Sequence, residues 1–327
     1  MSTRLGTQSE TYGSLPNITQ KETSSEYVEP TNIRSLLRRS VNEAEIRTTT
    51  IDDRKLYSSI DHTTPAYTRN PNFWLKGYHR AYTCLTTQTE EAQDNCKLCT
   101  AVTPRHAVAA FHSGYAPDVG TTVRFVTEDN VVVERTVVEN TRLTVPEGNS
   151  DVSMVMFDSD LPDTIVPCKI LPASIKNVVH DFYERFIQSW TDRLEQEAVV
   201  LVSSDQEYKT HPQFWRGSSA IRSGDWASLT DSVNPSQSYL DQYPDYQKSL
   251  DRFRIRGELP IEGDSGNPLF IAVNNQLWLV SVFHTQTSGP LYSDYSQLLN
   301  DMIATQDASQ GVSTGYTVTE GDIATLR

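Results

Sequence analysis

Three short motifs carry the residue types that acyl transfer requires. A serine stands in the glycine-flanked run Gly263-Asp264-Ser265-Gly266-Asn267-Pro268. His112 ends one apolar run, and Asp151 opens another. A serine hydroxyl becomes nucleophilic when a histidine takes its proton and a buried carboxylate orients that histidine. These residues therefore predict nucleophilic attack on a carbonyl carbon.

The glycines beside Ser265 suit the turn that such a nucleophile needs. Glycine adopts backbone conformations that other residues avoid, so the turn can direct its amides toward one point. The amides of Gly263 and Ser265 form the candidate oxyanion hole, which would stabilise the charge of a tetrahedral intermediate. The apolar residues 269–273 that follow predict a strand behind the turn.

The order and context of these motifs resemble the trypsin/chymotrypsin family of serine peptidases. In that family an apolar strand runs into Ala-Ala-His, Asp-Ile-Ala-Leu opens another strand, and Gly-Asp-Ser-Gly-Gly-Pro holds the nucleophile. The matching runs here are Ala109-Ala110-Phe111-His112, Asp151-Val152-Ser153-Met154 and Gly263-Asp264-Ser265-Gly266-Asn267-Pro268. The resemblance covers about residues 71–306. It implies a serine endopeptidase that acts on proteins or peptides and requires no cofactor or metal.

Two histidines compete for the role of general base. When the family motif is aligned with this strand, His112 takes the position of the catalytic histidine. His106, which lies earlier in the strand, is the second candidate. The resemblance implies that Asp151 is buried and accepts the N–H of His112. A strand-capping carboxylate is the alternative role for Asp151.

Several positions depart from the family pattern. Ser113 and Ile261 replace two usual cysteines, and Asn267 replaces the second glycine after the nucleophile. The usual disulfides therefore cannot form, which agrees with a reducing compartment or a divergent branch. In the family, the residue matching Asp264 pairs with a chain end released by cleavage. No matching activation motif precedes the first predicted barrel, so activation of that kind is not expected.

The four cysteines do not predict a disulfide scaffold, because they are few and unevenly spaced in a long chain. Cys96-Lys97-Leu98-Cys99 has the spacing of a zinc or redox half-site. No second pair completes it, so we expect reduced thiols instead.

Two positions bear on the substrate side chain. Leu259 stands six residues before the nucleophile, where trypsin-like members carry an acidic residue, so a preference for Lys or Arg is not expected. His284 resembles the pocket histidine of glutamate-specific and picornaviral-protease-like members, which implies acidic or Gln side chains at the cleaved position. Alternatively, His284 hydrogen-bonds Asp151 from behind or simply ends a strand.

The elements around the motifs are predominantly strands. Two β-branched runs at 121–126 and 131–138 flank Glu128-Asp129-Asn130 and predict a hairpin. Residues 175–194 carry an apolar stripe at helical spacing. A second helix, capped by Ser293, carries an apolar face of Leu298, Leu299, Met302 and Ile303. With the resemblance, this predicts an all-β, chymotrypsin-like double antiparallel β-barrel with an extra linker helix and a C-terminal helix.

The domain boundaries follow from composition and from the resemblance. We expect a polar and largely unstructured N-terminal extension at 1–70, a first barrel at 71–172 and a linker helix at 173–198. A second barrel with the C-terminal helix follows at 199–306, and a tail at 307–327. Residues 222–251 are polar and predict surface loops. Residues 34–39 are either a short docking helix for a partner or a solvated stretch.

Charge and hydropathy restrict the partners. The formal net charge is -14, whereas nucleic-acid binding needs clustered basic residues, so no nucleic-acid partner is expected. No apolar run is long enough to span a membrane, and the N-terminus lacks the pattern of a secretory signal. These features favour a cytoplasmic or virion-associated protein.

The same motifs leave two other functions open. An inactive homologue would keep the fold as a binding or scaffold module, such as a viral structural component, if Asn267 misforms the oxyanion hole. An esterase would use the same three residues on activated esters without cleaving peptides.

Overall fold

The computed structural model describes the parts of the chain that carry both predicted barrels. The described ranges are 52–87, 98–112, 115–145, 148–173, 199–204, 207–219, 226–229, 264–283 and 288–326. Within these ranges, no helix has both the length and the apolar character that crossing a membrane requires. The predicted helix at 175–194 lies outside them, as do residues 34–39.

The first sheet is a six-stranded antiparallel sheet that closes on itself. Its strands are β3 (Thr86–Thr87), β4 (Thr100–Ala101), β5 (His106–Ala110), β6 (Thr122–Val126), β7 (Val132–Val145) and β8 (Gly148–Phe157), in the order β3-β6-β7-β8-β5-β4. Leu85 and Thr100 form an antiparallel bridge between the two edges. Closure removes the open strand edges, which would otherwise expose unpaired backbone groups.

The predicted hairpin in this sheet is confirmed. β6 and β7 form an antiparallel pair. Val126 lies opposite Val132 next to the turn, and Thr122 lies opposite Thr136 at the other end. Asn130 lies in the connecting turn with a φ of 66°, a left-handed conformation that asparagine tolerates better than most residues. β7 is longer than its β-branched run predicted, because it continues to Val145 against β8.

The second sheet has seven described strands. They are β9 (Lys169–Ile170), β10 (Val199–Ser204), β11 (Thr210–Ser219), β12 (Trp226–Leu229), β13 (Pro268–Val273), β14 (Gln276–Val282) and β15 (Ser288–Pro290), in the order β15-β12-β11-β10-β13-β14-β9. Only β9 runs parallel to its neighbour, β14, among these strands. β12 lies within the stretch that we expected to form loops. It is a strand because its backbone pairs with both β11 and β15.

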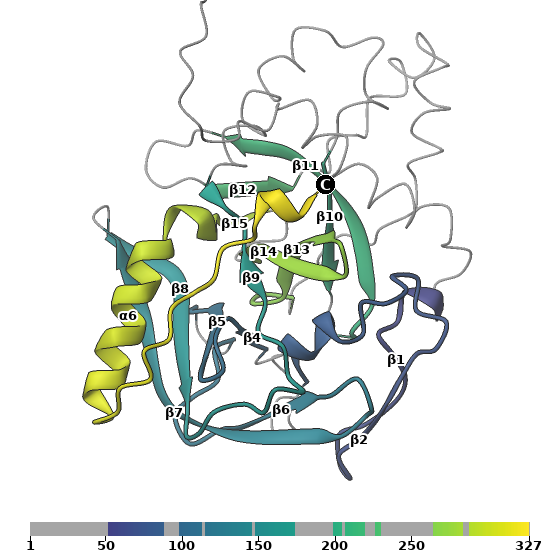
Figure 1. Cartoon of the computed structure of the whole chain (residues 1–327), viewed down its shortest axis with the longest axis horizontal. Coiled ribbons are helices and arrows are strands. Elements are labelled where there is room, and N and C mark those ends of the chain that lie inside the picture. The colour runs from purple at the N-terminus through teal and green to yellow at the C-terminus, as the bar shows by residue number, and fades with distance from the viewer. Residues whose placement is uncertain are drawn as a thin grey trace, which may run out of the picture.

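Residues that we placed in the N-terminal extension belong to the folded body. A short 3-10 helix, η1 (Asp52–Arg54), leads into the hairpin of β1 (Tyr57–Asp61) and β2 (Ala66–Arg69). The Tyr57 and Tyr67 side chains of this hairpin are buried. Leu56 N–H donates to the carbonyl oxygen of Tyr208 at 2.9 Å, which links this segment to the start of β11. Figure 1 shows β1 and β2 at the side of the first sheet.

The C-terminal helix packs on the first sheet. α6 (Ser296–Ser309) follows a 3-10 turn, η4 (Tyr292–Asp294), and lies along β7 and β8 (Figure 1). Leu299 and Ile303 are buried on its inner face, as the apolar spacing predicted. The prediction that Ser293 caps this helix is wrong. Ser293 is buried within η4 and makes no side-chain cap, because the 3-10 turn shifts the start of the helix to Ser296.

The tail after α6 returns across the molecule. Ile170 in β9 receives a hydrogen bond from Gly321 N–H and donates its own N–H to Thr319, both at 2.9 Å. A last 3-10 helix, η5 (Ile323–Leu326), follows. In Figure 1 the tail runs from the far end of α6 back to the second sheet. The tail therefore pairs with β9, the edge strand of the second sheet.

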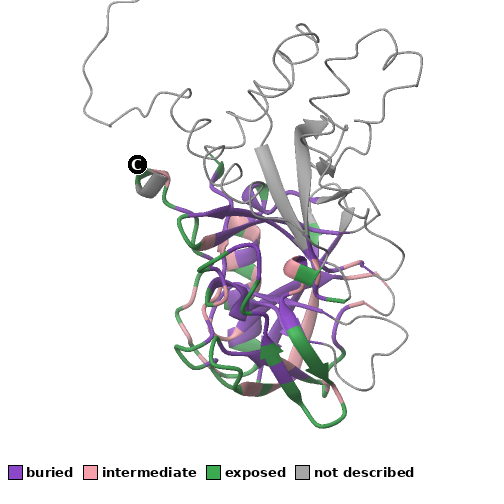
Figure 2. Ribbon diagram, turned by 90° about the vertical axis from the view of Figure 1, so that its right-hand side faces the viewer, coloured by how far each residue is buried: buried purple, intermediate pink, exposed green. Residues whose placement is uncertain are grey.

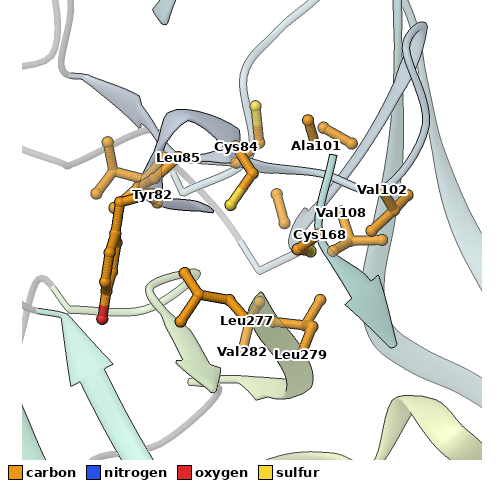
Figure 3. Close-up of a cluster of buried hydrophobic side chains, with 14 of the residues drawn as sticks. Tyr82, Cys84, Leu85, Ala101, Val102, Val108, Cys168, Leu277, Leu279 and Val282 are labelled. Atoms are coloured by element: carbon orange, nitrogen blue, oxygen red, sulfur yellow. The ribbon is translucent and has the colours of Figure 1, made fainter. Parts of the chain in front are cut away.

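The hydrophobic core is continuous between the sheets. Figure 2 shows buried residues gathered within the strands and exposed ones on the outer turns. Side chains from the 3-10 helix η2 (Ala81–Cys84), the first sheet and β14 meet in the cluster of Figure 3. The labelled members are Tyr82, Cys84, Leu85, Ala101, Val102, Val108, Cys168, Leu277, Leu279 and Val282. Burying one such Leu or Val contributes about 1.5–3 kcal/mol, so this contact holds the two sheets together.

This architecture confirms the predicted fold class. The strands are almost entirely antiparallel, the first sheet is closed, and the second sheet is followed by a C-terminal helix. The chain therefore has an all-β, chymotrypsin-like fold.

Candidate active site

Sheet pairing brings His112 and Asp151 together. β5 ends at Ala110, which pairs with Val152 of β8. The next residue, Phe111, donates its N–H to the carbonyl oxygen of Asp151 at 3.0 Å, so the pairing continues beyond β5. His112 then places its Nδ1 atom 2.6 Å from Asp151 Oδ2. Residues far apart in sequence thus meet through the register of two neighbouring strands.

The geometry of this pair sets the state of the imidazole. The Asp151 side chain is 6% exposed, whereas that of His112 is 28% exposed. An ionised carboxylate only accepts hydrogen bonds, so Nδ1 carries the hydrogen that it donates to Asp151. Nε2 is then the nitrogen that can accept a proton. The imidazole is partly open to solvent while its orienting carboxylate is shielded.

Two tyrosines flank the pair. The Tyr115 ring lies 4.7 Å from the His112 ring, centroid to centroid. Tyr292 is fully buried, and its phenol pKa is raised well above the usual range, first by burial and then by the negative charge of Asp151. The neutral phenol therefore forms part of the enclosed surroundings of the carboxylate. It comes from η4, which follows the second sheet.

The turn that carries Ser265 is tightly held by backbone hydrogen bonds. Asn267 N–H donates to the carbonyl oxygen of Asp264 at 3.0 Å, which closes a four-residue turn around Ser265 and Gly266. Phe283, after β14, accepts from Gly266 N–H at 2.8 Å and donates to the Asn267 carbonyl oxygen at 2.9 Å. Asp264 and Asn267 are buried, whereas Ser265 between them is partly exposed. The turn thus presents its serine outward.

Gly266 places this turn against the strand that leads to His112. Its φ of +87° lies in the region that favours glycine. A Cβ built there would lie 3.4 Å from the Leu98 carbonyl oxygen and 3.5 Å from the Ala110 nitrogen. Because Ala110 is two residues before His112, the Ser265 turn of the second sheet lies beside the end of β5. The arrangement could support proton transfer between a serine and an imidazole.

His106, the fallback base, lies elsewhere. It is fully buried in β5, where Thr103 Oγ1 hydrogen-bonds its Nδ1 atom at 2.9 Å. Its Nε2 atom lies 3.5 Å from Asp307 Oδ1 on helix α6. Burial lowers the pKa of His106 to about 4, although the Asp307 charge opposes the shift. His106 therefore lies where the sheet meets helix α6, and the structure does not bring it to Ser265.

Several predicted site residues lie outside the described ranges. These are Gly263, Leu259 and His284, together with the replaced positions Ser113 and Ile261. The roles predicted for them stay predictions.

The cysteines within the described ranges are Cys84, Cys99 and Cys168, all buried and free. Burial raises the pKa of the Cys99 thiol to about 12, so it stays protonated at neutral pH. Cys96 lies outside the described residues. No group of three or more potential metal ligands occurs within the described part of the chain.

Sequence reasoning missed Tyr115, Tyr292 and the side-chain role of Asn267. Asn267 was noted only as the replacement for a glycine, yet its Nδ2 atom lies 3.3 Å from Asp264 Oδ1. Tyr292 directly precedes the predicted Ser293 cap, but nothing in the local pattern indicates its approach to Asp151. These contacts join different elements, and only the nearness of Tyr115 to His112 in sequence offered a signal.

Comparison with known proteins gives a fold-level likeness. No family model matches the chain, and no curated protein matches it. Among solved structures, the chain is similar to neuropsin, a serine protease expressed in the limbic system of mouse brain. The identity is 12% with a TM-score of 0.39, and the alignment covers 68% of this chain and 96% of neuropsin. The strand order and the closed first sheet of this chain themselves define its fold class.

Proposed function

We propose that this chain is a serine endopeptidase that hydrolyses peptide bonds through an acyl-enzyme on Ser265. The observation that carries the proposal is the 2.6 Å hydrogen bond between His112 Nδ1 and the buried carboxylate of Asp151. It supports the proposal because it directs a basic nitrogen toward the open side of the pair. The Ser265 turn lies beside the same strand end.

The reaction would proceed in two steps. Ser265 Oγ attacks the scissile carbonyl carbon while His112 Nε2 takes its proton, and Asp151 stabilises the resulting imidazolium. The C–N bond then breaks as His112 gives the proton to the leaving amine. Water, deprotonated by His112, attacks the ester carbon and releases the acid product with Ser265 restored. These steps require no redox change and no cofactor.

The amide of Ser265 is available for the oxyanion of each tetrahedral intermediate. Gly266 and Asn267, the next two residues, use their N–H groups within the protein. Among the described residues, the Ser265 N–H has no hydrogen-bond acceptor. We propose that it acts with the Gly263 N–H as the oxyanion hole.

The proposed specificity depends on two residues outside the described ranges. Leu259 removes the acidic group that a pocket for Lys or Arg requires. His284 would donate a hydrogen bond to a Glu or Gln side chain at the cleaved position. Substrates are therefore proteins or peptides with Glu or Gln before the scissile bond.

Peptide cleavage by the wild type and Ser265→Ala tests the function. A diverse peptide library is incubated with each protein and read by mass spectrometry. We expect cleavage by the wild type and a loss of roughly 10⁴-fold or more in the variant, because the nucleophile is removed. Enrichment of Glu or Gln before the cut, lost in His284→Ala, would support the proposed pocket.

Two further measurements separate the alternatives. A fluorophosphonate probe should label the wild type and not Ser265→Ala, whereas a scaffold protein would leave both unlabelled. Turnover of activated esters with no peptide cleavage by the folded wild type would point instead to an esterase. Circular dichroism of both proteins establishes that each is folded.

A further inference from the structure

The turn around Ser265 contains a buried acidic residue. Asp264 is 1% exposed and directly precedes the proposed nucleophile. An ionised carboxylate in such a place is stable only when hydrogen-bond donors replace the water that it loses. Asn267 supplies one of these donors, because its Nδ2 atom lies 3.3 Å from Asp264 Oδ1.

The Asn267 side chain is itself fully buried, and its two ends differ. Nδ2 faces the carboxylate, while Oδ1 has no hydrogen-bond partner among the described residues. Reversing the amide would turn its oxygen toward the negative charge of Asp264, so the charge selects the observed orientation. Among the described residues, the amide oxygen thus stays without a partner while the amide nitrogen faces Asp264. Such an arrangement indicates that the contact has a task beyond filling space.

The contact spans the turn that orients the Ser265 amide. Asp264 and Asn267 are its first and last residues, and they are also joined by the 3.0 Å backbone hydrogen bond. Phe283 holds the Gly266 and Asn267 side of the turn. At the Asp264 end of the turn, the Asn267 side chain contacts the carboxylate. Rotation about Asp264 would swing the peptide that carries the Ser265 N–H.

We propose, on the basis of the proposed function, that Asn267 is a positioning residue that acts through Asp264. Its amide holds the Asp264 carboxylate, and this contact keeps the Ser265 N–H directed at the developing oxyanion. The replacement of a glycine by Asn267 then assembles the hole instead of misforming it.

Kinetics of Asn267→Ala test the positioning role. We expect kcat per active site to fall by about 10–100-fold with KM within about threefold, because a misdirected donor is lost mainly in the transition state. Active sites are counted by the fluorophosphonate burst, so unfolded protein does not contribute. Asn300→Ala is the control. Its Oδ1 accepts from Val318 N–H at 2.8 Å away from the turn, so it should lower Tm and leave kcat unchanged.

A double-mutant cycle with Asp264→Asn separates positioning from packing. If Asn267 acts through the carboxylate, adding Asn267→Ala to Asp264→Asn should change kcat by less than about threefold. Equal effects of Asn267→Ala in both backgrounds would overturn the proposal. So would a wild-type kcat in the single variant.

The isosteric variant Asn267→Asp covers the case in which Asn267→Ala does not fold. Two neighbouring carboxylates share a proton at low pH, and that proton restores a donor between them. The labelling rate relative to the wild type should therefore fall as pH rises, by about tenfold or more. A ratio that is constant with pH would contradict the proposal. If the folded wild type itself is not labelled at Ser265, the proposed function fails, not merely the inference about Asn267.

Discussion

His106 and His112 lie on the same short stretch of chain but have opposite environments. His112 pairs with Asp151 and remains 28% exposed, whereas His106 is fully buried and faces Asp307. Thr103 Oγ1 accepts the backbone N–H groups of Arg105 and His106. The Thr103 hydroxyl hydrogen can therefore be donated to His106 Nδ1. The imidazole then carries its own hydrogen on Nε2, the nitrogen that faces Asp307. The length of β5 separates the two histidines, because His106 is its first residue and His112 follows two residues after its last.

The buried state of His106 predicts acid sensitivity of the fold. Its pKa is about 4 in the folded protein and 6.5 without the surrounding structure. Between these values the unfolded chain binds a proton that the folded chain does not. The contribution to the free energy of unfolding is therefore fully present above pH 6.5. We expect it to be lost as pH falls toward 4, by on the order of 3 kcal/mol.

Urea unfolding at several pH values measures this contribution, with His106→Gln as the comparison. The wild type should lose more stability than the variant between pH 6.5 and 4. The pKa of half-buried His79 is also lowered by burial, but His79 is present in both proteins and its contribution cancels. Parallel pH curves for the two proteins would show that His106 is not the sensitive group.

At the level of elements, helix α6 is attached to the sheet that carries His112 and Asp151. Gln306 is fully buried in the last turns of the helix. Its Nε2 atom donates to the Met154 carbonyl oxygen at 2.9 Å and to Thr141 Oγ1 at 3.1 Å. Asp307, the next residue, accepts from Thr314 N–H at 2.9 Å and thereby secures the start of the tail. Polar contacts therefore complement the apolar face of the helix.

Replacing Gln306 with Ala should destabilise the protein by about 1–3 kcal/mol, because it removes two hydrogen bonds, one of them to the buried Met154 carbonyl oxygen. Gln297→Ala on the same helix is the matched control. Gln297 is exposed, and among the described residues it bonds Asp301 within the helix, so its loss should cost less than about 0.5 kcal/mol. Thermal or urea unfolding of both variants gives the comparison. Equal stabilities would mean that the apolar face alone attaches α6.

At the level of the whole molecule, the two termini of the described chain connect its two sheets. The N-terminal segment reaches the second sheet through Trp74, whose Nε1 atom donates to Thr210 Oγ1. The C-terminal tail follows α6, which packs on the first sheet, and pairs with Ile170 of β9 in the second sheet. The proposed site draws residues from both sheets, so these connections add to the hydrophobic core in holding its two halves together.

Gly321 tests the fit of the tail. A Cβ at this position would lie 2.4 Å from two ring carbons of Trp278, which is fully buried in β14. We expect Gly321→Ala to destabilise the protein by about 1–3 kcal/mol, because neither the ring nor the paired backbone can move away. Trp278→Phe replaces the indole with a smaller ring and so reduces the overlap. Unfolding of the two single variants and the double variant should therefore show that the alanine costs less in the Trp278→Phe background than in the wild type. Additive effects would mean that the tail shifts freely.

The sequence by itself determined the features that depend on local pattern. The all-β class, the hairpin around Asn130 and the apolar face of α6 follow from residues close together in the chain, because side-chain alternation and turn preferences are local. The order of His112, Asp151 and Ser265 was also readable. Their catalytic roles stay predictions, although the expected hydrogen bond between His112 and Asp151 is present.

Only the tertiary structure decided which distant groups meet. Closure of the first sheet and return of the tail bring three pairs of distant residues together. These pairs are His106 with Asp307, Tyr292 with Asp151, and Gly321 with Trp278. The structure likewise shows that Asn267, read from sequence as a lost glycine, donates a hydrogen bond to Asp264. Local preferences do not determine such long-range contacts, because these contacts arise from the packing of whole elements into one continuous core.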